Sequence, residues 1–218
     1  MVTAFGGGIL FAAVALELVP EADAGAGTPL TAVGLLGGTV AYVGIDSWLT
    51  RAPADEAMRR SAHAAAAGRA MAMPGHDEAA RGESIAAGLF VDGVPESIAL
   101  GLTIAEGEIG VALLAGVLIG NVVEAYGAAQ PIIAGGHTQR FAITLMAAIG
   151  GALAVATILG GTVLANADES LIGTAQAIAA GAILAVVTVS IVPHAFAEVS
   201  GLVALASVAG FIAGYVLS

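Results

Sequence analysis

The stretch FAITLMAAIGGALAVATILGGTVLA, residues 141–165, contains no charged side chain. A helix needs about 20 consecutive apolar residues to cross the hydrocarbon core of a bilayer. The apolar residues run continuously and do not alternate with polar ones, which argues against a strand of a transmembrane barrel. The stretch therefore predicts a helix that spans a membrane.

Six further apolar segments accompany this one, at residues 4–19, 28–49, 84–105, 109–134, 171–193 and 201–217. Charged residues make up only 11% of the chain, against about 25% in a soluble globular protein. This composition excludes a soluble domain and a disordered chain. We expect an all-α, polytopic transmembrane helix bundle of about seven spans that forms one domain over residues 1–218.

The charge distribution predicts an orientation in the membrane. The chain has 6 basic and 17 acidic residues, so it offers no basic patch for nucleic acid. All basic residues are arginines, and they fall in two predicted loops: Arg51, Arg59, Arg60, Arg69 and Arg81 in one, and Arg140 in the other. Arginine-bearing loops stay on the cytoplasmic side. We therefore expect a cytoplasmic loop at about 50–82, in a multi-pass protein of the cell membrane whose environment is the lipid bilayer.

An internal repeat is visible at an offset of 173 residues. It aligns LFAAVALELVPEA (10–22) with ILAVVTVSIVPHA (183–195). The same offset pairs Pro20 with Pro193 and Tyr42 with Tyr215. The aligned segments are five crossings apart and so run in opposite directions, which is the inverted topology of many secondary transporters. A chance likeness between two alanine-rich helices is the alternative.

Acidic and amide side chains lie in the middle of two consecutive segments. Asp92 and Glu96 are four residues apart in the third segment, and therefore share one helix face. Asn121 and Glu124 are three residues apart in the fourth segment. Because consecutive spans are antiparallel, both pairs fall at a similar depth in the membrane. Gln130 is a candidate to support the second pair.

The free-energy cost of burying these acids in a membrane indicates that they have a function. An ionised carboxylate at the bilayer centre costs about 2.5–3.5 kcal/mol, and none of the seven segments contains Lys or Arg to pair with one. A divalent cation would offset the repulsion, so we predict a metal site formed by Asp92, Glu96, Asn121 and Glu124. Two alternatives stay open: a proton- or sodium-coupled carrier of another small solute, and a non-transporting membrane subunit with neutral carboxyl groups.

Other features are less specific. Pro95 removes a helical hydrogen bond and is expected to free the carbonyl of Val91 beside the acids. Tyr42 suits the aromatic belt at a membrane surface, and Glu17 an interfacial position. The chain has no G-x-S-x-G, H-E-x-x-H or Walker motif, so we do not expect an enzyme.

Four stretches resemble one family of membrane proteins. DGVPESIALG (92–101) is similar to the HNxPEGxAxG signature on the fourth helix of the ZIP (Zrt/Irt-like) metal transporters, and NVVEAYGAA (121–129) resembles their fifth helix. Residues 6–22 and 179–195 resemble the second and seventh helices. The resemblance implies that the seven segments correspond to family helices two to eight, without the first.

The resemblance implies uptake of divalent metal into the cytoplasm by movement of one helix bundle against another. It implies no cofactor apart from the transported ion, which would be Zn²⁺, Mn²⁺ or Fe²⁺. The signature His falls on Asp92, its Asn on Gly93 and its final Gly on Ser97, and a His or Gln position of the next helix falls near Gly120. The remaining donors are oxygens, which favour harder ions than zinc. One or two metal sites, and a monomer or a homodimer, stay open.

Overall fold

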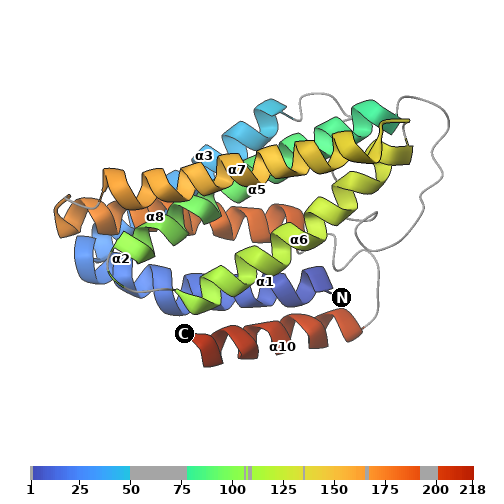
Figure 1. Cartoon of the computed structure of the whole chain (residues 1–218). Coiled ribbons are helices and arrows are strands. Elements are labelled where there is room, and N and C mark those ends of the chain that lie inside the picture. Colours follow the sequence, from blue (N-terminus) through green and yellow to red (C-terminus); the bar gives the residue numbers. More distant parts are fainter. Residues whose placement is uncertain are drawn as a thin grey trace.

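The computed structural model describes residues 2–49, 78–105, 107, 110–134, 136–164, 167–191 and 201–218, and every regular element in these ranges is a helix (Figure 1). Within these ranges six helices are long and apolar enough to cross a membrane: Ala4–Ala26, Thr28–Trp48, Gly88–Ala105, Val111–Ala134, Gln139–Val163 and Glu169–Val189. A seventh apolar helix, Leu202–Leu217, has 16 residues. The described residues therefore form the expected helical bundle of a multi-pass membrane protein.

The elements follow the predicted segments closely. They are α1 Val2–Ala13, the π-helix η1 Val14–Leu18, α2 Val19–Ala26, α3 Thr28–Leu49, α5 Glu78–Ala105, α6 Val111–Ala134, α7 Gln139–Val163, α8 Glu169–Val186, the π-helix η2 Val187–Ile191 and α10 Leu202–Leu217. The first span continues to Ala26 rather than ending at 19. Helix α5 begins at Glu78, inside the loop expected at 50–82, while residues 50–77 and Pro193 lie outside the described part of the chain.

Two of the described turns between spans depend on a glycine or a polar residue. Gly27 alone joins α2 to α3, and its φ of 78° is a left-handed conformation that glycine adopts without steric cost. Its amide donates to the carbonyl of Asp23 at 2.9 Å. Thr138 caps α7, because its hydroxyl accepts the amide of Phe141 at 3.2 Å and satisfies one donor that the first turn leaves without a helical partner.

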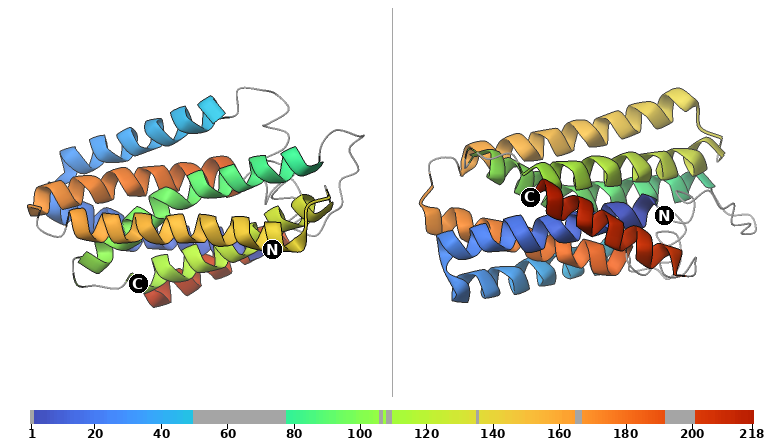
Figure 2. Two further views of the ribbon diagram at one scale, coloured as in Figure 1. Left: turned by 45° about the horizontal axis from the view of Figure 1, so that its top comes forward. Right: turned by 90° about the horizontal axis from the view of Figure 1, so that it is seen from below.

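The helices pack as two groups. In one group α1 contacts α10, and α8 contacts both α2 and α3; in the other, α5 contacts α6 and α7. Figure 2 shows α10 crossing α1 in the view from below. The groups meet where α1 packs on α6 and α5 packs on α8. The buried core includes Leu10 of α1 and Val14 of η1 together with Leu113 and Val117 of α6. This contact between the groups positions the candidate site.

Close backbone contact holds the first group together. At four of the described glycines of this group an added Cβ would overlap a backbone carbonyl oxygen of the neighbouring helix most severely. They are Gly8 against Ser207 and Gly210 against Phe5, between α1 and α10, and Gly38 against Ile178 and Gly181 against Leu35, between α3 and α8. Small residues allow such an approach in membrane helices, where packing rather than the hydrophobic effect drives association.

The helix pair α1–α10 and the helix pair α8–α3 share several structural details. The π-helices Val14–Leu18 and Val187–Ile191 are separated by 173 residues, and so are the contact residues Phe5 and Ile178. Helices α1 and α8 run in opposite directions (Figure 1).

In the second helix of each pair, α10 and α3, the residues in equivalent positions differ by one residue from the 173-residue offset. The glycine that meets Phe5 is Gly210, and the glycine that meets Ile178 is Gly38, so these two are separated by 172 residues. The alignment at 173 would have chosen Gly37, beside which nothing lies within 4 Å. The aligned tyrosines also differ, since Tyr42 is 3% exposed and Tyr215 is 64% exposed.

Candidate metal centre

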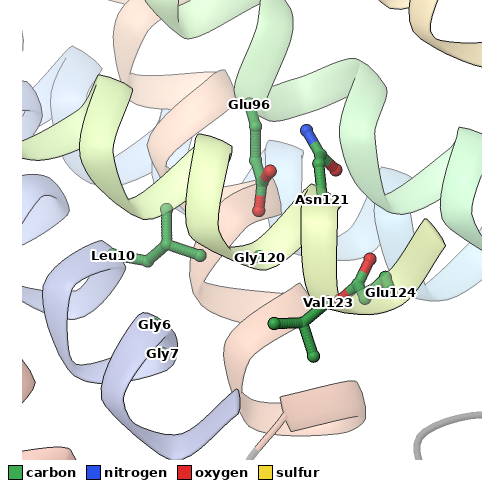
Figure 3. Close-up of a pocket in the computed structure, with 8 residues that line it drawn as sticks. All are labelled: Gly6, Gly7, Leu10, Glu96, Gly120, Asn121, Val123 and Glu124. Carbon is green, nitrogen blue, oxygen red and sulfur yellow. The ribbon is translucent and has the colours of Figure 1, made fainter. Parts of the chain in front are cut away.

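A small cavity lies where α1, α5 and α6 meet, and three of the predicted ligands line it (Figure 3). Glu96 comes from α5, and Asn121 and Glu124 come from α6. The remaining wall is formed by small and apolar residues: Gly6, Gly7 and Leu10 of α1, and Gly120 and Val123 of α6. The cavity therefore presents two carboxylates and one amide against walls that offer little other polarity.

The cavity is narrow. The space open to the centre of a water-sized sphere is about 10 Å³, close to the minimum that one water molecule needs. The side chain of Glu96 is buried, at 6% exposure, while Asn121 and Glu124 are half-buried. Among the described residues that line the cavity none is basic. The cavity therefore has room for about one water-sized particle, and its charged lining residues are acidic.

The predicted set of four ligands is brought together only in part. Glu96, Asn121 and Glu124 share the cavity, but Asp92 is not one of the described residues that line it. Within the described ranges no group of three or more His, Cys, Asp or Glu side chains could hold a metal ion. Gln130 is exposed and does not reach the cavity, so its predicted supporting role is wrong. The cavity wall therefore has two carboxylates, those of Glu96 and Glu124.

Asp92 accepts a hydrogen bond from a residue of another helix. Its Oδ1 atom accepts a hydrogen bond from the Tyr42 hydroxyl of α3 at 2.6 Å, and both side chains are buried. This length is typical of a hydroxyl that donates to a charged carboxylate. The expectation that Tyr42 lies in an aromatic belt is wrong. Its position well before the end of the segment 28–49 is the sequence signal that pointed inward.

Helix α5 runs without interruption through Pro95. Pro95 has no amide hydrogen to donate to the Val91 carbonyl, although the helix continues past it, and irregular turns lie in η1 and η2. Gly93, on which the family signature places Asn, faces α7: an added Cβ would lie 2.6 Å from Cδ1 of Leu153. An asparagine here would displace Leu153 and would not point toward the cavity.

Two further polar contacts join the spans. The Glu17 carboxylate of η1 accepts hydrogen bonds from the backbone amides of Ala112 and Leu113 in the first turn of α6. The fully buried Gln176 of α8 donates through Nε2 to Oε2 of Glu21 at 3.1 Å. Glu17 was expected at an interface and Gln176 was not singled out. A lone glutamine inside the apolar segment 171–193 was the available signal.

Comparison with known proteins identifies no relative. No family model matches the chain, and neither a curated protein nor a solved structure matches it.

Proposed function

We propose that the protein is a divalent metal cation transporter of the ZIP type, which carries Zn²⁺-, Mn²⁺- or Fe²⁺-like ions across the cell membrane into the cytoplasm. One observation supports this most directly. Glu96, Asn121 and Glu124, from two consecutive membrane helices, line one small cavity inside the bundle. The transported ion binds to these three side chains, and Asp92 lies one helical turn from Glu96 on α5.

The chemistry of the cavity favours a dication over a neutral solute. Two ionised carboxylates in a membrane interior repel each other, and an ionised carboxylate is costly there. The chain's arginines in described helices, Arg81 and Arg140, lie in the first turns of α5 and α7. A divalent ion offsets the carboxylate charge, and carboxylate and amide oxygens suit Mn²⁺, Fe²⁺ and Mg²⁺ better than Zn²⁺. We expect a preference for the harder ions.

An inverted repeat would supply the mechanism. The paired π-helices, η1 and η2, and the matching glycine contacts of the α1–α10 and α3–α8 pairs support such a repeat. The site lies on the contact between the two helix groups. Movement of the α5–α6–α7 group against the other would expose that contact to each side of the membrane in turn, as in other repeat transporters.

Metal-dependent thermal stability tests the proposal. A ligand that binds only the folded state raises the melting temperature. We would melt the purified chain with Mn²⁺, Fe²⁺, Zn²⁺, Mg²⁺ and Ca²⁺, and compare it with Glu96→Gln/Glu124→Gln and with Glu169→Gln, whose side chain is exposed. The wild type and Glu169→Gln should be stabilised and the double variant should not.

Transport itself is measured in vesicles. Reconstituted wild type should take up Mn²⁺ and the double variant should not. Equal stabilisation and equal uptake by wild type and double variant would refute the proposal. Proton uptake that needs no metal would favour a coupled carrier of another solute instead.

A further inference from the structure

Tyr42 connects two helices that share few other contacts. It lies on α3, which packs mainly on α8, while Asp92 lies on α5, which packs on α6, α7 and α8. The hydrogen bond from the Tyr42 hydroxyl to Asp92 Oδ1, 2.6 Å long, therefore crosses from one helix group to the other. Tyr42 is 3% exposed and Asp92 is 4% exposed, so bulk water does not compete for this bond.

Asp92 and Glu96 lie one turn apart on the same face of α5. Glu96 lines the cavity, whereas Asp92 is directed to the phenol of Tyr42. The third carboxylate that the sequence predicts for the site is thus near the cavity but engaged elsewhere. A metal ion and the tyrosine hydroxyl compete for the same kind of carboxylate oxygen.

We propose that Tyr42 is a positioning residue that holds Asp92 outside the metal cavity, and that Asp92 becomes a ligand when this hydrogen bond breaks. The proposal rests on the proposed function, because it needs a cation at Glu96, Asn121 and Glu124. With the bond intact, two carboxylates bind the ion weakly. With Asp92 released, a third carboxylate adds charge and a donor oxygen, and oxygen sites bind divalent ions more tightly as their charge rises.

This arrangement links affinity to the position of the helix groups. Displacement of α5 relative to α3 would separate Asp92 from Tyr42, so the ion is held more firmly in the displaced state than in the conformation described here. A tyrosine that only filled space would have no such effect. The two roles differ in one measurable respect: whether removal of the hydroxyl changes metal affinity through Asp92.

Equilibrium binding of Mn²⁺ to the purified full chain, measured by titration calorimetry, tests the proposal. The variants are Tyr42→Phe, Asp92→Asn and the double variant, with Tyr215→Phe as the control, because Tyr215 is an exposed tyrosine on α10. Tyr42→Phe should bind Mn²⁺ about tenfold more tightly, a change of 1.4 kcal/mol. Tyr215→Phe should bind like the wild type. The double variant should bind no more tightly than Asp92→Asn.

Unchanged or weaker binding by Tyr42→Phe overturns the proposal, and so does tighter binding that persists in the Asp92→Asn background. Tyr42→Leu, which also lacks the hydroxyl, replaces Tyr42→Phe if the latter does not fold. The Glu96→Gln/Glu124→Gln variant separates the two hypotheses. If it loses Mn²⁺ while Tyr42→Phe behaves like the wild type, only the role of Tyr42 fails. If it binds like the wild type, the proposed function fails and this inference fails with it.

Discussion

Oε2 of Glu17 lies 3.0 Å from the point that a Cβ on Gly110 would occupy, so glycine gives this carboxylate room beside the first turn of α6. The amides of Ala112 and Leu113 donate to the Glu17 carboxylate, although Oε2 itself accepts no hydrogen bond from the described residues. The first amides of a helix have no partner within the helix, and they carry a partial positive charge. A carboxylate from another helix can satisfy both needs, and here it joins the two helix groups.

Replacement of Glu17 by alanine should therefore destabilise the fold. The loss of a helix cap costs about 1 kcal/mol, which should appear as a lower melting temperature of the protein in detergent. Asp23→Ala is the matched control, since Asp23 is an exposed acid on α2. Equal melting temperatures for the two variants would show that Glu17 does not stabilise α6.

The neighbouring glycines of α3 should respond differently to alanine. A Cβ at Gly38 would overlap the carbonyl oxygen of Ile178, whereas nothing lies within 4 Å of one at Gly37. Gly38→Ala should force α3 from α8 and cost about 1–3 kcal/mol, as overpacking does. Gly37→Ala should be neutral or slightly stabilising, because alanine is the better helix former. Thermal melts of both variants would check the packing register, and a larger loss for Gly37→Ala would contradict it.

An imidazole at Gly120 should change the preference for metal. Gly120 lines the cavity, and a Cβ there meets nothing within 4 Å. Nitrogen ligands favour Zn²⁺ over Mn²⁺, so Gly120→His should raise the ratio of Zn²⁺ to Mn²⁺ affinity by about tenfold. Gly44→His serves as the control, since Gly44 is equally unobstructed but lies on α3. Competition titrations measure the ratio, and the same rise in both variants would place the zinc elsewhere.

Gln176 should be needed for stability. It is 0% exposed, and its Nε2 donates to Glu21. Gln176→Leu keeps the volume but removes the hydrogen bond to Glu21, and a hydrogen bond to a charged group contributes about 1.5–3 kcal/mol. Gln139→Leu, at the exposed start of α7, should cost less than Gln176→Leu in the same melting experiment. If the two variants melt alike, the buried contact contributes little.

The helices could be predicted from sequence because uninterrupted apolar runs have few alternatives. The segment 28–49 coincides with Thr28–Leu49, and 201–217 nearly coincides with Leu202–Leu217. The packing between the helices could be predicted less well from the sequence. Alignment paired Gly37 with Gly210, but contact with the partner helix selects Gly38. The packing register depends on which face each helix turns toward its partner. A shift of one residue cannot be recognised in a sequence that contains so many small residues.

The candidate site, too, could be predicted only in part from the sequence. Glu96, Asn121 and Glu124 could be found because polar residues within a span are costly and therefore informative. The hydrogen bond between Tyr42 and Asp92 could not be predicted. Spacing along α5 places Asp92 and Glu96 on one face, but it does not specify which residue of α3 contacts Asp92. Spacing along one helix is a local property, whereas the competing donor comes from 50 residues away.

The π-helical turn in the first span has a consequence for every residue that follows it. A helix with one additional residue in a turn is rotated by about 100° beyond that point, compared with regular winding. Removal of a single residue from Val14–Leu18 would therefore let this turn wind as a regular α-helix and keep Glu21 directed to Gln176, whereas removal of a residue from the regular part of α1 would rotate α2 away from it. The wide turn thus absorbs one residue of the sequence without changing the face that the following helix presents to α8.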